Sequence, residues 1–211
     1  KVAGYKKELE NQGNTVVLVD VGDAIQGGTI GTLSKGSDIV DIMNTVGYDI
    51  AIPGNHEFDY GMNTFFDLNK QAEYSYISCN FMNLEKKKPV LQPYKIMQLA
   101  DKKVAFVGIS TPKTITTSTP KNFQNEKGEY TYGFCHGESG EELYQVVQKT
   151  VDEAKNDGAD YVIALSHLGI GEECSPWKST DVIEHTRGID VFLDGHSHST
   201  LNGEKVRNLN G

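Results

Sequence analysis

Short apolar runs, each followed at once by polar side chains, constrain the fold of this chain more than any other sequence feature. The run 15–20 is rich in β-branched residues, too short for a helix and apolar on both faces, as in a buried parallel strand. Comparable runs occupy 48–52, 161–165 and 191–194. Helical patterns separate these runs, so the sequence predicts an α/β fold with largely parallel strands.

Apolar residues recur at helical spacing in several segments, some of which end at a glycine. We expect helices over 1–12, 38–46, 62–70, 138–156 and 179–185. Ser37 or Asp38 is expected to cap the second of these helices, because both side chains can accept a hydrogen bond from the first turn.

Further strands are expected over 76–79 and in a hairpin formed by 94–99 and 103–110 around a charged turn. The hairpin indicates a mixed sheet or a second sheet layer. By contrast, 111–137 has little periodicity, and we expect a loop there; a loop of this length is usually functional, mobile or both.

The composition limits what the chain can be. Its 211 residues, 37% of them hydrophobic, are enough for one α/β domain with a sizeable core. A net charge of −9 argues against nucleic acid as a partner, because there is no basic surplus to displace counterions. No apolar run approaches the roughly 20 residues of a membrane span, and the N-terminus has no signal-peptide pattern.

The three cysteines, Cys79, Cys135 and Cys174, lie far apart without a Cys-x-x-Cys pair. They therefore indicate neither a disulfide framework nor a thiolate zinc cluster. The adjacent Cys135 and His136 could form half of a metal site, but no second pair matches them, so a plain loop is the simpler interpretation.

The stretch 53–61 carries the densest set of polar side chains. Asn55, His56, Glu57 and Asp59 follow directly after an apolar run, and glycines bracket them. Read alone, the stretch could be a polar loop whose Asn and Asp cap the next helix. The rest of the chain favours a different interpretation, because three other strand ends repeat the arrangement.

Polar side chains with metal-binding groups follow all four predicted strands. They are Asp23 after the first, Asn55 to Asp59 after the second, His167 after the third, and His196 with His198 after the fourth. Each of them alone could be a cap or an ordinary structural residue. Ligands in open α/β sheets bind outside the carboxyl ends of the strands, so together these loops are expected to form one site.

The donors in this predicted site are carboxylate oxygen, amide oxygen and imidazole nitrogen, a mixture that suits Zn²⁺, Mn²⁺, Co²⁺ or iron. Five candidate ligands exceed the needs of one four-coordinate catalytic ion, so we expect two ions, roughly 3.5–4 Å apart. His56 cannot easily share an ion with the adjacent Asn55. Asp59 is placed to orient the His56 ring, which makes His56 a candidate general acid.

Other catalytic patterns do not fit. The glycines at 22 and 27 lack the Lys-Ser/Thr that follows a phosphate-binding P-loop. There is also no Gly-x-Ser-x-Gly nucleophile elbow.

Four motifs resemble the ordered motifs of the calcineurin-like metallophosphoesterases, and in particular the 5'-nucleotidase branch, which includes 2',3'-cyclic-nucleotide phosphodiesterases. They are Gly22-Asp23-Ala24-Ile25-Gln26-Gly27, Gly54-Asn55-His56-Glu57-Phe58-Asp59-Tyr60-Gly61, Ser166-His167-Leu168-Gly169 and Asp194-Gly195-His196-Ser197-His198. The motifs span nearly the whole chain.

The resemblance implies a four-layer αββα sandwich with mixed, largely parallel sheets and a centre of two divalent metal ions, Zn, Mn or similar. Asp23 would bridge the ions, Asn55, His167 and His196 would complete one site, and His198 would belong to the other. The implied reaction is hydrolysis of a nucleotide or other phosphoester: a metal-activated water attacks phosphorus in line, and the catalytic pair His56 and Asp59 assists the leaving group.

The sequence also departs from the family pattern. Family members begin with a strand ending in Asp-x-His, and nothing before Gly22 matches it. The resemblance further implies a C-terminal nucleotide-specificity domain. We therefore expect 1–211 to be a metallophosphoesterase catalytic domain without its first strand and that second domain. The family location, extracellular, periplasmic or at the cell surface, is implied in the same way.

Two hypotheses follow from the sequence. The first is a phosphohydrolase that acts on nucleotides. The second is a non-catalytic metal-binding or surface interaction module that keeps the phosphoesterase fold. The missing Asp-x-His favours the second, whereas His56 and Asp59 favour the first, because a binding module needs no general acid.

Overall fold

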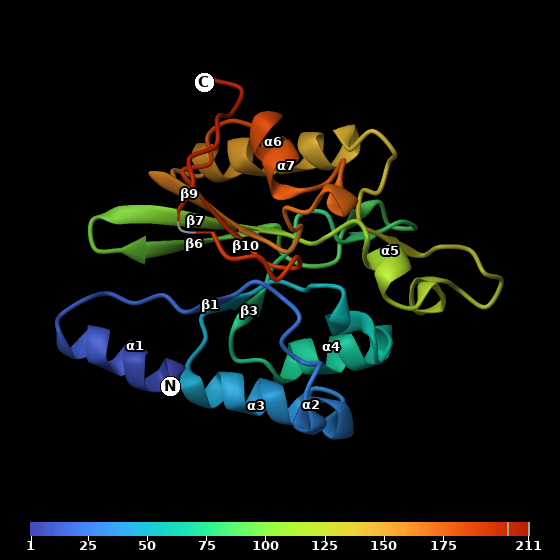
Figure 1. The fold of residues 1–211 in the computed structure, drawn as a ribbon, viewed down its shortest axis with the longest axis horizontal. Coiled ribbons are helices and arrows are strands. Elements are labelled where there is room, and N and C mark those ends of the chain that lie inside the picture. Colours follow the sequence, from blue (N-terminus) through green and yellow to red (C-terminus); the bar gives the residue numbers. More distant parts are fainter. Residues whose placement is uncertain (202, 211) are drawn as a thin grey trace.

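Two β-sheets lie face to face between two layers of helices (Figure 1), which confirms the expected α/β sandwich. The computed structural model describes residues 1–201 and 203–210. Among these residues, no helix is both long enough and apolar enough to cross a membrane.

The first sheet consists of three parallel strands in the order β1 (Val19–Asp20), β2 (Ile50–Ala51) and β3 (Ser75–Tyr76). Its outer face carries the N-terminal helices. These are α1 (Val2–Asn11), α2 (Thr29–Ser34), α3 (Ser37–Val46) and α4 (Met62–Gln71).

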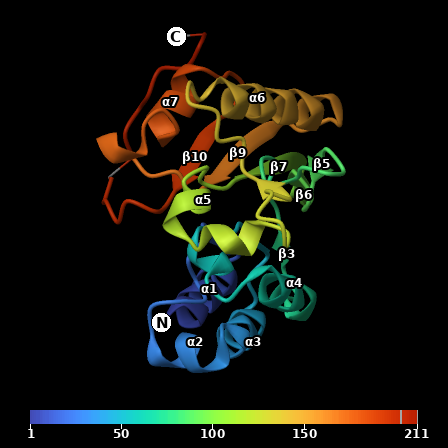
Figure 2. The ribbon, with the colours of Figure 1, turned by 90° about the vertical axis from the view of Figure 1, so that its right-hand side faces the viewer.

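The second sheet has the order β10 (Val191–Asp194), β9 (Tyr161–Ser166), β7 (Lys102–Ile109) and β6 (Tyr94–Leu99). Its strands are parallel except β6, which pairs antiparallel with β7 as the predicted hairpin. Helices α6 (Glu141–Asn156) and α7 (Ser179–Glu184) cover its outer face, on the side opposite α1 to α4 in Figure 2.

Short elements complete the chain. A small antiparallel sheet is formed by β4 (Met82–Asn83), β5 (Lys88–Pro89) and β8 (Tyr132–Gly133). The remaining elements are α5 (Thr114–Thr117) and the 3₁₀ helices η1 (His56–Phe58), η2 (Pro120–Phe123) and η3 (Glu172–Cys174).

The hydrophobic core has one part between the sheets and one part under each helical layer. Under α4, Phe58 is fully buried, with its ring centroid 4.9–5.4 Å from those of four other phenylalanines. These four are Phe65, Phe81, Phe123 and Phe134. Because Phe58 lies between His56 and Asp59 in η1, this cluster fixes the backbone that carries both of them.

Three strand predictions were too long, and of the expected 48–52 only Ile50–Ala51 forms a strand. The run 15–20 pairs with a strand only at its end, because the Leu18 N–H donates to the Asp49 carboxylate (2.8 Å) instead. The segment 76–79 leaves the first sheet after Tyr76 and crosses to the second, where the Cys79 N–H donates to the Gly108 carbonyl (2.8 Å).

Other local predictions were also wrong. Gly36, not Ser37 or Asp38, is the N-cap of α3, and the Ser34 hydroxyl accepts the Asp38 N–H in its first turn (3.3 Å). The expected loop over 111–137 contains α5, η2 and β8, and α2 forms where the sequence predicted no helix.

Candidate metal centre and catalytic pair

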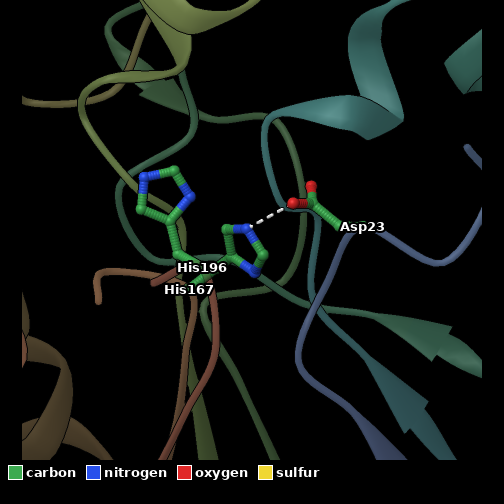
Figure 3. Close-up of side chains that lie close together, drawn as sticks. All are labelled: Asp23, His167 and His196. Atoms are coloured by element: carbon green, nitrogen blue, oxygen red, sulfur yellow. Dashed lines mark hydrogen bonds and ion pairs between the residues drawn. The ribbon is translucent and has the colours of Figure 1, made fainter. Parts of the chain in front are cut away.

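Asp23, His167 and His196 come together from the ends of β1, β9 and β10 (Figure 3). One ligand atom of each lies within 4.8 Å of the corresponding atoms of the other two. The structure therefore brings three of the predicted strand-end residues together, although they are far apart in the sequence. The set of one carboxylate and two imidazoles fits a borderline divalent cation.

Both ring nitrogens of His167 face acceptors. Nδ1 lies 2.5 Å from the Val21 carbonyl oxygen, and Nε2 lies 2.9 Å from Asp23 Oδ2. Burial lowers the pKa of His167, but the hydrogen bond and charge of Asp23 outweigh this and raise it. When Nδ1–H donates to the Val21 carbonyl, the neutral ring leaves the lone pair of Nε2 free to bind a cation beside the Asp23 carboxylate.

His196 is held in the form that binds metals. Burial and the neighbouring charge of His167 lower the pKa of His196, so its imidazole is neutral near pH 7. Its ring centroid lies 5.0 Å from that of His167.

Asn55, which precedes His56 in the loop after β2, has a buried oxygen that a cation could pair. The residue is 4% exposed, and its Oδ1 is a buried side-chain oxygen with no hydrogen-bond partner in the part of the chain that the structure describes. A buried polar atom left unpaired costs about 1–3 kcal/mol. A cation at Oδ1 would remove that cost, so Asn55 fits the role of a ligand.

His198 lies in the same cavity as Asp23, His167 and His196, but its side chain is exposed. Its nitrogens lie outside the group of mutually close ligand atoms that the described residues form. The structure therefore places His198 beside the group and not within it.

His56 and Asp59 form the pair that the sequence predicted. Nδ1 of His56 lies 2.6 Å from Asp59 Oδ2, and the two side chains are 39% and 23% exposed. Burial lowers the pKa of His56, but the hydrogen bond that its ring donates to Asp59 and the charges of Asp23, Asp59 and Glu57 outweigh this and raise it. The alternative interpretation as helix caps does not hold, because Gly61 is the N-cap of α4.

The Asp23 carboxylate connects this pair to the candidate metal site. Its Oδ1 accepts the backbone N–H of His56 (2.9 Å), while its Oδ2 faces His167. The His56–Asp59 pair and the candidate metal-binding group therefore lie side by side.

Glu57, for which the sequence predicted no specific role, holds two of the loops together. Its buried carboxylate accepts the backbone N–H groups of Asp23 (2.8 Å), Ala24 (2.8 Å) and Gly54 (2.7 Å). Burial and the nearby Asp23 and Asp20 carboxylates raise the pKa of Glu57 to about 7. Its position inside the Asn-His-Glu-Phe-Asp stretch was the only signal that could have identified it.

The loops after β1 and β2 approach so closely that only glycine fits between them. A Cβ on Gly54 would lie 2.4 Å from Asp23 Oδ1 and 2.8 Å from His167 Nε2. One on Gly22 would lie 2.6 Å from the Gly54 nitrogen. The two glycines therefore make room for the carboxylate and the imidazole.

Asp194 plays a similar part at the other loops. Its Oδ1 accepts the Ser166 hydroxyl (2.9 Å) and the Leu168 N–H (2.9 Å), on either side of His167, and its Oδ2 accepts the Ser179 hydroxyl. The sequence contained Asp194 in a motif but did not indicate this role.

Three of the candidate ligands have left-handed backbone conformations. The φ angles are +66° at Asp23, +81° at His196 and +53° at His198. Residues with a Cβ seldom adopt this conformation, and it concentrates at functional sites.

Asp20, the last residue of β1, is a partly buried carboxylate whose charge is expected to lower stability at neutral pH. Burial raises the pKa of Asp20 to about 6, against the opposing hydrogen bond from the Gly22 N–H (2.9 Å). Because this pKa is higher in the folded than in the unfolded chain, folding takes up a proton and stability falls as the pH rises from about 4 to about 6. Asp20→Asn keeps an acceptor and removes the charge, so we expect it to raise the free energy of unfolding of the metal-free protein at pH 7 by about 2–3 kcal/mol.

Urea unfolding in the presence of a chelator, at pH 7 and at pH 4, tests this prediction. The gain is expected to be small at pH 4, where the folded protein already carries the proton. Asp101→Asn, at a side chain that is 82% exposed, is the control and is expected to change stability little at either pH. A loss of stability in Asp20→Asn at pH 7 would contradict the prediction.

The chain is similar in sequence and in structure to proteins of one known family. Residues 3–200 match the sequence model of the family described as calcineurin-like phosphoesterase. The chain is 30% identical over 203 residues to a snake venom 5'-nucleotidase of Naja atra, covering 92% of this chain and 34% of that protein. It is 25% identical over 233 residues to a 2',3'-cyclic-nucleotide 2'-phosphodiesterase/3'-nucleotidase of Salmonella typhimurium, covering 100% of this chain and 34% of that protein.

Among solved structures, a 5'-nucleotidase precursor from Thermus thermophilus is similar, with a TM-score of 0.78 and 25% identity. The similarity covers 97% of this chain and 37% of that chain. This chain therefore spans about a third of the length of the relatives that it matches.

Proposed function

Because this chain belongs to the calcineurin-like phosphoesterase family, we propose that it is the catalytic domain of a metal-dependent phosphohydrolase that acts on nucleotide phosphoesters. One observation carries the proposal. The Asp23 carboxylate contacts His167 of the metal-binding group through one oxygen and the backbone of His56 through the other. A potential general acid thus lies beside a potential cation site, an arrangement that suits hydrolysis of a phosphoester.

Asp23, Asn55, His167 and His196 would hold one divalent cation, and Asp23 would share a second with His198. Bound there, such cations would withdraw charge from the phosphoryl group and make water a better nucleophile. The unpaired Oδ1 of Asn55 supports the first of these sites.

His56 would act on the leaving group. Its Nδ1 is occupied by Asp59, so Nε2 is the nitrogen available to the substrate. The raised pKa of His56 favours the imidazolium near neutral pH, which can donate a proton to the departing oxygen or stabilise its charge. Asp59 keeps the ring oriented during this transfer.

The named relatives support nucleotides as the substrate class, either 5'-monophosphates, 2',3'-cyclic phosphates or both. Their greater length supports the proposal that this domain works within a longer polypeptide, whose further part would select the nucleotide. An extracellular, periplasmic or cell-surface location is part of the same proposal.

Metal content and hydrolysis together test the function. We expect about two divalent ions per chain by elemental analysis, and release of phosphate from 5'-AMP or opening of 2',3'-cyclic AMP after addition of Mn²⁺ or Zn²⁺. Chelation is expected to abolish turnover, and added metal to restore it.

The assay is to be run on this chain and on its full-length polypeptide. Bound metal without hydrolysis of any nucleotide in the full-length polypeptide would contradict the proposal and leave the non-catalytic metal-binding module. Turnover only in the full-length polypeptide would mean that the reaction needs residues outside this chain.

A further inference from the structure

The segment 111–123 packs against the stretch that carries the catalytic pair. The Ser118 hydroxyl lies 3.1 Å from Asp59 Oδ1, and Nδ2 of Asn122 donates to the Phe58 carbonyl (2.8 Å). The Phe123 ring packs edge-on against Phe58, with centroids 5.4 Å apart. Three successive contacts thus join a segment without sequence periodicity to η1.

Ser118 is itself held firmly. The residue is 8% exposed, and its backbone N–H donates to the Thr114 carbonyl (3.1 Å), closing the last turn of α5. At the other end of that turn, the Thr114 hydroxyl donates to the Thr111 carbonyl (2.7 Å). The backbone that carries Ser118 is therefore fixed, and its hydroxyl lies within hydrogen-bonding distance of Asp59.

The two oxygens of Asp59 have different partners. Oδ2 accepts from His56 Nδ1, and Oδ1 accepts from Ser118. A carboxylate bound through one oxygen can still rotate about its Cβ–Cγ bond, whereas one bound through both cannot. Ser118 thus fixes the plane of the carboxylate that orients the His56 ring.

We propose that Ser118 is a positioning residue for the His56–Asp59 pair, so that Ser118, Asp59 and His56 form a hydrogen-bonded series ending at the proton donor. The inference rests on the proposed function, because it assigns Ser118 a part in the reaction of the same site. A purely structural role, in which Ser118 only ties α5 to η1, is the alternative.

Leaving groups of different basicity separate these two roles. The alkoxide leaving group of 5'-AMP needs a proton from His56, whereas the phenolate of p-nitrophenyl phosphate leaves readily without one. In the full-length enzyme, we expect Ser118→Ala to lower kcat about tenfold for 5'-AMP, with KM and metal content little changed. With p-nitrophenyl phosphate, we expect a loss of less than about twofold. Ser118→Thr, which keeps the hydroxyl, is expected to restore most of the 5'-AMP activity.

Asn122→Ala is the matched control. It removes another contact between the same two segments, but that contact reaches the backbone of Phe58 and not Asp59. We expect Asn122→Ala to affect both substrates by the same factor. An equal loss for both substrates in Ser118→Ala would overturn the inference in favour of the structural role.

A proton NMR measurement keeps the test independent of turnover. The Nδ1–H resonance of His56, assigned by its loss in His56→Asn, is expected to exchange with water more rapidly in Ser118→Ala than in the wild type. Unchanged exchange would overturn the role of Ser118, even in a protein that hydrolyses nothing. Failure of the wild type to hydrolyse any phosphoester would instead overturn the proposed function.

Discussion

Replacing His56 with asparagine is expected to lower kcat for nucleotide hydrolysis about 10²–10⁴-fold while the metal content stays at the wild-type level. Asparagine can donate a hydrogen bond but cannot transfer a proton to a leaving alkoxide. The side chain of His56 points to Asp59 through Nδ1 and is not in the group formed by Asp23, His167 and His196. Its loss therefore leaves the proposed ligands intact. Elemental analysis measures the metal content, and steady-state kinetics on the same samples measures kcat.

His136→Asn is the control, because His136 is an exposed histidine in the segment before α6. We expect this variant to keep both metal and turnover. If His56→Asn retained wild-type turnover, His56 would not be the proton donor, and the catalytic role given to the pair would be wrong. If it lost metal along with turnover, His56 would be a ligand instead.

Replacing Gly54 with alanine is expected to lower metal affinity at least about tenfold and to abolish most of the activity. The new methyl group would lie 2.4 Å from Asp23 Oδ1 and 2.8 Å from His167 Nε2, so one of these ligands must move. The backbone at Gly54 is outside the left-handed region, so alanine can adopt it and the clash alone is tested. We also expect a loss of about 1–3 kcal/mol in the free energy of unfolding.

Gly4→Ala in α1 is a suitable control, since a Cβ there would have no neighbour within 4 Å. Alanine is a better helix former than glycine, so this variant is expected to gain up to about 1 kcal/mol and to bind metal normally. Isothermal titration with Zn²⁺ or Mn²⁺ measures the affinities. Wild-type affinity in Gly54→Ala would show that the loops after β1 and β2 can separate without harm to the site.

Local sequence patterns predicted an α/β fold with largely parallel strands and the meeting of three strand-end residues, whereas the four-layer sandwich was implied by the family resemblance. A β-branched run indicates a buried strand, and parallel strands present their carboxyl ends at one edge of a sheet. Asp23, His167 and His196 are therefore brought together by topology alone.

Features that depend on contacts between distant segments could not be predicted in this way. Glu57 resembles a polar loop residue until its three backbone partners, two of them more than thirty positions away, are seen. Ser118 lies in a segment without periodicity, and its partner Asp59 is 59 positions earlier. The early end of the strand run 15–20 depends in the same way on the side chain of Asp49.

The left-handed backbone at Asp23, His196 and His198 lowers the stability of the folded chain, although the proposed chemistry needs these side chains. That conformation costs a residue with a Cβ about 1–2 kcal/mol relative to glycine, which adopts it freely. Selection for thermal stability alone would accordingly favour glycine at these positions and would discard the candidate ligands. A programme of directed evolution that screens only for heat resistance is thus expected to drift toward a more durable but inert protein, unless these three codons are held fixed.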